Sequence, residues 1–168
     1  MLPKLVLTDV DGVLTDGGMY YHEDADELKK FNTSDSAGVL FLHLLNIPVG
    51  IITGERTEIV RRRAEKLKID HLFMGITDKR GTVEKLAGKL GIAMEDIAYI
   101  GDDINDIQLL AACGFSAVPA SSPDYVARHA DIRLSRKGGD GVFREFVERI
   151  LTDNNLLDKA LDLYLGSV

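Results

Sequence analysis

The sequence predicts an α/β fold built on a doubly wound parallel sheet. Short apolar segments typical of strands buried on both faces alternate along the chain with segments whose apolar residues recur at helical spacing. This alternation favours parallel strands joined by right-handed crossovers through helices. The 168 residues are 45% hydrophobic, and no repeat, low-complexity tract or flexible linker divides them, so we expect a single domain over residues 1–168.

The predicted elements of this Rossmann-like arrangement are joined by short connections. The first strand begins at Leu5 and ends before Asp9, and later apolar segments predict strands over residues 47–53, 72–74, 97–101, 115–118 and 132–134. Ser34 or Asp35 is suited to cap the first helix. Helical spacing predicts helices over residues 36–46, 57–68, 81–90, 107–113 and 142–151, then an amphipathic segment over 156–165 within a C-terminal tail of about residues 153–168.

A small inserted β-hairpin is predicted at about residues 17–31, directly after the first strand. Residues 19–22 and 27–31 flank an acidic turn, and the two segments carry three aromatic residues, Tyr20, Tyr21 and Phe31. Because an isolated hairpin is only marginally stable in water, these aromatic residues would be unusual on a free ribbon. We therefore expect the hairpin to pack on something else, for example another subunit.

The bulk properties argue against several classes of protein. A net charge of −7 argues against nonspecific nucleic-acid binding, which needs a basic face. No apolar segment approaches membrane-spanning length, and the first residues do not have the charged and apolar regions of a signal peptide. A single cysteine, Cys113, fits a reducing compartment, so we expect a cytoplasmic protein. No metal-ligand spacing is seen among the histidines, which we interpret as structural or surface residues: His22, His43, His71 and His129.

The first strand delivers two acids to the carboxyl edge of the sheet, where open α/β folds bind their ligands. Asp9 follows the strand directly, and Asp11 precedes Gly12, which allows a backbone turn that a side chain would hinder. Burying two carboxylates there is costly unless a cation, hydrogen bonds or catalysis compensates. The alternative interpretation is an Asp-rich turn without chemistry.

Three further polar motifs are expected at the same edge. Thr53 and Gly54 end the second strand of the sheet, Lys79 precedes a helix, and three acids follow the strand over 97–101, namely Asp102, Asp103 and Asp106. Each motif alone has an ordinary explanation, as a turn, a solvated lysine or a helix cap. Together, and in this order, they have a chemical logic that none has alone.

That logic is phosphoryl transfer. Carboxylates from two strands can share Mg²⁺, which prefers a few carboxylates together with water and phosphate oxygens. Asp9 is placed to attack phosphorus and form an aspartyl-phosphate, while Asp11 is suited to protonate the leaving oxygen and later to deprotonate water. Thr53 and Lys79 supply a hydroxyl donor and a positive charge for the phosphoryl group. We expect Asp106 either to anchor Lys79 or to support the metal ligands from behind.

These motifs resemble those of the haloacid dehalogenase superfamily of phosphohydrolases. The four motifs of that superfamily match residues 9–13, Thr53, Lys79 and residues 101–106. The resemblance implies that Asp9 is the nucleophile and Asp11 the acid/base. It also implies that Mg²⁺ is held by three residues, which are Asp9, Asp11 through its backbone carbonyl, and Asp102.

A narrower likeness covers nearly the whole chain. The short length, the hairpin in place of a separate cap domain, and local sequences such as Phe31-Asn32 and residues 138–141 are similar to the capless branch of the superfamily. That branch dephosphorylates 2-keto-3-deoxy sugar acids, such as 3-deoxy-D-manno-octulosonate 8-phosphate. The resemblance implies a homotetramer in which the hairpins pack at the centre and neighbouring subunits, including their C-terminal tails, close the active sites.

One departure from the branch follows Gly54. Members that act on the eight-carbon acid typically have arginine there, whereas this chain has Glu55, which accepts hydrogen bonds from hydroxyls and repels a carboxylate. In this it looks like the related enzymes for 2-keto-3-deoxy-D-glycero-D-galacto-nononate 9-phosphate, so the nine-carbon substrate is favoured and the eight-carbon one is the alternative. Arg63 and Lys66 lie on adjacent turns of the following helix and are expected to meet the substrate carboxylate, unless they form a solvated face.

Two interpretations compete with a phosphatase. A response-regulator receiver is also an α/β domain phosphorylated on aspartate, with its acid pair near the N-terminus and its phospho-acceptor on the third strand. Here the order differs, because Thr-Gly follows the second strand and a hairpin interrupts the chain after the first. A catalytically retired scaffold is expected to lose some of the reacting residues, whereas this chain keeps all four: Asp9, Asp11, Lys79 and Asp102.

Overall fold

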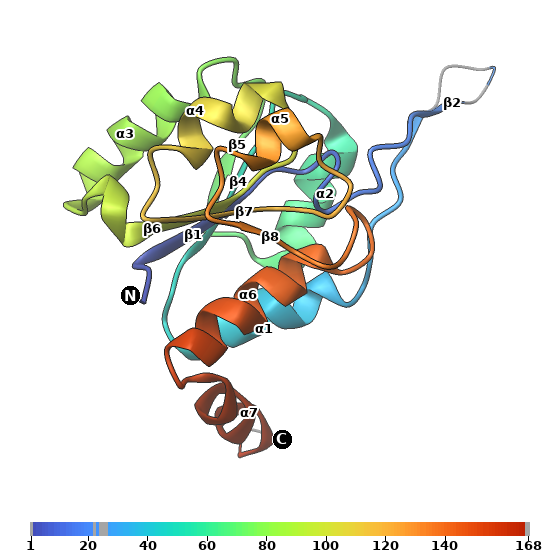
Figure 1. The fold of residues 1–168 in the computed structure, drawn as a ribbon. Helices are drawn as coiled ribbons and strands as arrows, with labels where there is room; N and C mark the ends of the chain where they lie inside the picture. Colours follow the sequence, from blue (N-terminus) through green and yellow to red (C-terminus); the bar gives the residue numbers. More distant parts are fainter. Residues whose placement is uncertain (1, 22, 24–26, 167–168) are drawn as a thin grey trace.

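The computed structural model describes residues 2–21, 23 and 27–166, and it contains one six-stranded parallel sheet. The strand order is β5-β4-β1-β6-β7-β8 (Figure 1). The strands span Leu5–Thr8 (β1), Val49–Ile52 (β4), His71–Phe73 (β5), Ile97–Ile100 (β6), Phe115–Val118 (β7) and Ile132–Arg133 (β8). The doubly wound α/β class predicted from the sequence is confirmed.

Helices cover both faces of the sheet (Figure 1). On one face lie α1 (Asp35–Leu44), α2 (Glu58–Leu67) and α6 (Val142–Asp153), and α7 (Leu157–Leu165) packs against α1 and α6. On the other face lie α3 (Lys79–Leu90), α4 (Ile107–Leu110) and α5 (Asp124–Ala127). Two 3-10 turns, η1 (Met94–Asp96) and η2 (Ile104–Asp106), flank β6.

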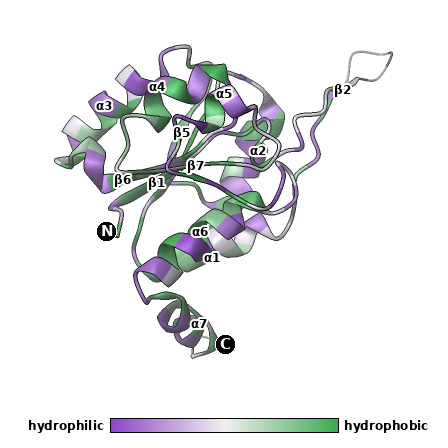
Figure 2. Cartoon of the chain, viewed as in Figure 1, coloured by the Kyte–Doolittle hydropathy of each residue, from purple (hydrophilic) through white to green (hydrophobic). Residues whose placement is uncertain are grey.

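The central strand β1 divides the hydrophobic core into two layers. Val6 belongs to the cluster under α1, α2 and α6, whereas Leu5 and Leu7 belong to the cluster under α3, α4 and α5. This is the alternation expected of a strand, whose successive side chains point to opposite faces of the sheet. All four β1 residues are buried, and the central strand β1 is mostly hydrophobic, whereas the outer helices carry many polar residues as well (Figure 2).

The chain reverses its direction of travel across the sheet at β1. It passes from β1 to β4 and β5 on one side, and then returns to β6 on the other side of β1. The carboxyl ends of β1 and β6 therefore form the topological switch point, where ligands bind in folds of this kind. The register holds these ends together, because Thr8 pairs with Ile100 and the Asp9 N–H donates to the Ile100 carbonyl at 3.0 Å.

The inserted hairpin is present but shorter than predicted. β2 (Tyr20–Tyr21) pairs with β3 (Glu27–Leu28) in antiparallel register, and a single bridge joins Thr15 to Phe31 at its base. The hairpin projects away from the body of the molecule (Figure 1), and it carries strongly exposed side chains, 71% for Tyr21 and 65% for Leu28. His22 and the turn residues 24–26, which belong to the predicted hairpin, lie outside the described residues.

Several predicted boundaries are corrected by the structure. Lys79 is the first residue of α3 and does not precede it, because the Asp78 side chain caps the helix by accepting the Gly81 N–H at 2.9 Å. Ser34 occupies the cap position of α1, but its side chain makes no capping hydrogen bond. The sequence analysis missed α5, which follows Pro123 and is too short to show a helical period. Within the described part of the chain, no helix has the length and hydropathy needed to cross a membrane.

Candidate active site

Three of the four polar motifs line one polar pocket of about 260 Å³ at the switch point, and the fourth, Lys79, does not line it but contacts Asp9. The walls of the pocket come from the loops after β1, β4 and β6, together with the segment that leads into the hairpin. The residues that line it are Asp9, Asp11, Gly12, Gly17, Thr53, Gly54, Glu55, Asp102, Asp103 and Asn105. The topology thus brings together side chains that are up to 96 positions apart in the sequence.

Asp9, at the end of β1, is 5% exposed and is held by two donors on different oxygens. The Val10 N–H donates to Oδ1 at 2.7 Å, and Lys79 Nζ lies 2.7 Å from Oδ2. The pKa of the Asp9 carboxyl is raised to about 7, chiefly by burial, with Lys79 opposing the shift and Asp106 adding to it. The carboxylate is therefore rigidly oriented and poorly solvated, which are properties of a positioned nucleophile.

Lys79 lies between two buried carboxylates. Its Nζ is 2.7 Å from Asp9 Oδ2 and 2.6 Å from Asp106 Oδ1, and its side chain is 1% exposed. Burial lowers the pKa of the Lys79 amine, but Asp9 and Asp106 outweigh this effect and the pKa is raised, so the group is charged. Tyr99, fully buried on β6, donates its hydroxyl to the same Asp106 oxygen. Asp106 therefore provides a second buried carboxylate that anchors Lys79.

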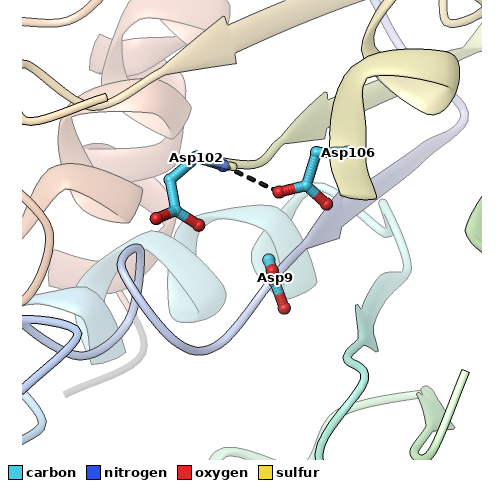
Figure 3. A group of neighbouring side chains, drawn as sticks. All are labelled: Asp9, Asp102 and Asp106. Carbon is cyan, nitrogen blue, oxygen red and sulfur yellow. Dashed lines mark hydrogen bonds between the residues drawn. The ribbon is translucent and has the colours of Figure 1, made fainter. Parts of the chain in front are cut away.

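The opposite oxygen of Asp106 organises the loop after β6. Its Oδ2 accepts the N–H group of Asp102 at 2.9 Å (Figure 3) and that of Asp103 at 3.1 Å. With two donors on each oxygen, the Asp106 carboxylate has no lone pair left for another partner. Asp103 caps η2 through the Ile104 N–H, which leaves Asp102 as the acid of this loop that faces Asp9.

The carboxylates of this edge suit a divalent cation. Oxygens of Asp9, Asp102 and Asp106 lie within 4.8 Å of one another (Figure 3). Burial raises the pKa of Asp102 to about 8, with Asp9 and Asp106 adding to the shift, and its Oδ1 is buried without a hydrogen-bond partner in the described chain. Buried carboxylates in such an arrangement need a compensating positive charge. Because Asp106 is saturated, Asp9 and Asp102 are the side chains of this trio with capacity to bind a metal ion.

Gly12 makes room for the side chain of Asp102. Its φ of +80° lies in the left-handed region, and a Cβ at this position would overlap the Asp102 carboxylate. Thr53 also lines the pocket, and its Oγ1 accepts the Glu55 N–H at 3.1 Å, so its own hydroxyl hydrogen is available to an anion. Gly54 and Glu55 are both exposed at the pocket wall.

Asp11 is contacted by a residue that the sequence analysis missed. Its Oδ1 lies 2.7 Å from Lys29 Nζ and accepts the Thr15 hydroxyl at 3.2 Å. The Lys29 side chain is only 1% exposed, and its ammonium also lies 3.3 Å from Glu27 Oε1. The one available signal was the position of Lys29 in the returning segment of the hairpin, which by itself does not distinguish it from Lys30.

Arg63 and Lys66 do not line the pocket that contains Asp9. They border a separate cleft of about 450 Å³ between α2 and the base of the hairpin. The Arg63 guanidinium lies over the Phe31 ring at 5.4 Å and donates to the Asn32 carbonyl at 2.9 Å. Within one chain, Arg63 therefore fixes the base of the hairpin, while Lys66 is exposed.

Comparison with known proteins places this site in a family. The family model of haloacid dehalogenase-like hydrolases matches residues 19–114, more than half of the chain. The chain belongs to the haloacid dehalogenase-like hydrolases. This membership confirms the family resemblance, identifies the protein as a phosphatase, and leaves no support for the receiver alternative.

Members of the family with similar sequences and structures point to one branch. The chain is 40% identical, over 88% of its length and 82% of the relative, to 3-deoxy-D-manno-octulosonate 8-phosphate phosphatase KdsC of Haemophilus influenzae. A phosphatase of that name from Moraxella catarrhalis, solved with a magnesium ion, a phosphate ion and KDO, has a TM-score of 0.92 at 34% identity, covering 96% of this chain and 93% of that one. The cobalt-bound form of the Haemophilus influenzae deoxy-D-mannose-octulosonate 8-phosphate phosphatase has a TM-score of 0.89 at 38% identity, covering 98% and 97%.

Proposed function

We propose that the protein hydrolyses 3-deoxy-D-manno-octulosonate 8-phosphate through an aspartyl-phosphate intermediate. The observation that carries the proposal is the buried carboxylate of Asp9, which is held by Lys79 at 2.7 Å in the same pocket as Asp11, Thr53 and Asp102. The relatives named above support this substrate.

The proposed reaction has two steps on the same carboxylate. An Asp9 oxygen attacks phosphorus and the bond from phosphorus to the sugar oxygen breaks, while Asp11 gives its proton to that oxygen. Water then attacks the phosphoryl group as Asp11 takes a proton back, and the bond between phosphorus and Asp9 breaks. Thr53 and Lys79 balance the charge on the phosphoryl oxygens, because a hydroxyl donor and an ammonium group are already in place.

We propose Mg²⁺ as the metal, held by the carboxylates of Asp9 and Asp102 and the backbone carbonyl of Asp11. The geometry fits such a group, because Asp102 Oδ1 is buried without a partner in the described chain. When bound, the ion neutralises charge on the phosphoryl group and on the two carboxylates. Dialysis against a chelator should abolish turnover, and Mg²⁺ should restore it; full activity in the metal-depleted protein would refute the assignment.

The substrate proposal departs from the preference expected from Glu55. That residue favoured the nine-carbon 9-phosphate, whereas the relatives named above carry the name of the eight-carbon 8-phosphate phosphatase. Glu55 is exposed at the pocket wall, where it is free to accept hydrogen bonds from sugar hydroxyls. We therefore keep Glu55 as a proposed substrate-binding residue, together with Gly54, and place the eight-carbon acid first.

The substrate is tested by comparing kcat/KM for the two sugar-acid phosphates under identical conditions. A higher kcat/KM for the eight-carbon compound is expected, and a clear preference for the nine-carbon compound would overturn the choice. Glu55→Arg, which introduces the side chain typical of the eight-carbon enzymes, should raise the ratio of eight-carbon to nine-carbon kcat/KM. Glu58→Arg, at an exposed position on α2 that does not line the pocket, is the matched control for the added charge.

We also propose a homotetramer assembled through the exposed hairpins. Arg63 and Lys66 line a cleft separate from the pocket of their own chain, so their expected contact with a substrate carboxylate requires a neighbouring chain. The cytoplasmic location expected from the sequence stays a prediction.

A further inference from the structure

The base of the hairpin places a buried ammonium group beside the proposed acid/base. Lys29 Nζ lies 2.7 Å from Asp11 Oδ1 and 3.3 Å from Glu27 Oε1, and the side chain is 1% exposed. The next residue, Lys30, is 65% exposed and lies 3.5 Å from Asp16. Because an ammonium group is costly to bury without partners, this position is built around its two carboxylates.

We propose that Lys29 is a positioning residue for the phosphatase reaction, which holds one oxygen of Asp11 so that the other oxygen carries the exchanged proton. The inference rests on the acid/base role of Asp11 in the proposed function. Asp11 Oδ1 accepts Lys29 Nζ at 2.7 Å and the Thr15 hydroxyl at 3.2 Å, whereas Asp11 Oδ2 is buried and has no hydrogen-bond partner in the described part of the chain. Two donors occupy Oδ1, so the proton of the acid form belongs on Oδ2.

This arrangement assigns each proton movement to one atom. In the first step the O–H bond at Asp11 Oδ2 breaks as the proton passes to the sugar oxygen released from phosphorus. In the second step Oδ2 takes a proton from the attacking water. Throughout, Lys29 and Thr15 keep Oδ1 in place, so the carboxylate does not rotate between the two steps.

The hairpin base is fixed well enough to serve as the support for Lys29. The Thr15–Phe31 bridge ties it to the loop after β1, and Arg63 ties it to α2 through the Asn32 carbonyl at 2.9 Å and the Phe31 ring at 5.4 Å. Lys29 therefore extends from an anchored segment, although the tip of the hairpin projects away from the body (Figure 1). The orientation of the Asp11 carboxylate therefore depends on the position of the hairpin base.

The test compares two leaving groups in Lys29→Met and in the matched control Lys30→Met. A sugar-acid phosphate releases an alcohol that needs a proton, whereas p-nitrophenyl phosphate releases a stable phenolate that does not. Because general acid catalysis is worth about 10²–10⁴-fold, Lys29→Met should lower kcat/KM for the sugar phosphate by about 10–100-fold and for p-nitrophenyl phosphate by less than about 3-fold. Most of the loss should lie in kcat, the inhibition constant of inorganic phosphate should stay unchanged, and Lys30→Met should behave as the unmodified protein.

Three further variants separate the possible failures. Lys29→Arg should recover part of the sugar-phosphate activity, because it restores a charged donor. Lys29→Gln keeps an uncharged donor and replaces Lys29→Met if that variant does not fold, with a smaller selective loss expected. An equal loss on both substrates in the Lys29 variants would overturn the inference. Asp11→Asn is the reference: if it shows the selective loss and Lys29→Met does not, only the inference fails, and if Asp11→Asn shows no selective loss, the proposed role of Asp11 fails with it.

Discussion

Two regions around the pocket use the same chemical device, a buried lysine between two carboxylates, but they build it differently. Lys79 lies 2.7 and 2.6 Å from Asp9 and Asp106, which follow neighbouring central strands and are 5% and 0% exposed. Lys29 lies 2.7 and 3.3 Å from Asp11 and Glu27, whose side chains are 32% and 24% exposed, and Glu27 belongs to the inserted hairpin. The first cluster is therefore part of the core, and the second joins an accessory segment to it.

The difference shows how the fold separates two tasks. The proposed nucleophile, Asp9, needs one fixed position and a poorly solvated environment, which the paired ends of β1 and β6 provide through register and burial. In the proposed reaction, Asp11 must exchange protons with a leaving group and with water, and it lies at the border between the core and the hairpin. Mutations in the two regions should consequently differ in how strongly they affect stability and activity.

The largest expected effect is at the nucleophile in the core cluster. Asp9→Asn should lower kcat by more than about 10⁴-fold, because an amide oxygen cannot form the intermediate. Asp11→Asn should lower it by about 10²–10⁴-fold on a sugar phosphate. Phosphate release by purified variants measures both, with the folded state checked by circular dichroism. Near-normal turnover of Asp9→Asn would remove the proposed nucleophile and with it the contrast between the regions.

A substitution of Lys79 measures how much the ion-paired cluster of Lys79, Asp9 and Asp106 contributes to the free energy of unfolding. Lys79→Met leaves the Asp9 and Asp106 carboxylates buried near each other without a cation, so we expect a free energy of unfolding lower by about 3–5 kcal/mol. Adding Asp106→Asn to this variant should recover part of the loss by removing one of the two charges. Urea denaturation measures the free energies. Lys29→Met should cost less, because the side chains of Asp11 and Glu27 are partly exposed; an equal cost for both lysines would contradict the comparison.

Much of the first region was predictable and much of the second was not, for a physical reason. The carboxyl ends of parallel strands gather at one edge, so Asp9, Thr53 and Asp102 were expected together from their positions alone. The contacts of Lys29 depend on how the hairpin folds back over the loop after β1, and lysines in a hairpin carry no local signal of burial. In the same way, helical spacing predicted which face of its helix Arg63 lies on, but it did not predict that the guanidinium packs against the Phe31 ring.

The loop at residues 138–141 gives a smaller effect and a matched control. A Cβ on Gly138 would overlap the backbone carbonyl oxygen of Gly12, and the neighbouring Gly139 N–H donates to the Val13 carbonyl at 2.9 Å. Gly138→Ala should therefore displace the loop that follows β1 and contains Asp9 and Asp11. We expect it to lower the free energy of unfolding by about 1–3 kcal/mol and to reduce kcat. Gly88→Ala, inside α3 with nothing within 4 Å of the new Cβ, should raise the free energy of unfolding by about 0.5–1 kcal/mol with kcat unchanged. Equal effects of the two variants would contradict the close approach.

The smallest effect on the stability of one chain is expected at the hairpin tip, where assembly is the main readout. Tyr21 and Leu28 are exposed by 71% and 65%, and exposed apolar side chains gathered on a projecting ribbon are typical of an interface. Light scattering should give the mass of four chains for the unmodified protein and a smaller mass for the double variant Tyr21→Ser with Leu28→Ser. Leu90→Ser, which removes an apolar side chain of 42% exposure at the end of α3, is the control and should leave the mass unchanged.

A single-chain mass for the unmodified protein at working concentration would refute the assembly. If the double variant dissociates but keeps its kcat on p-nitrophenyl phosphate, the tip serves assembly while the anchored base serves the reaction, which is the division that the two lysine clusters indicate.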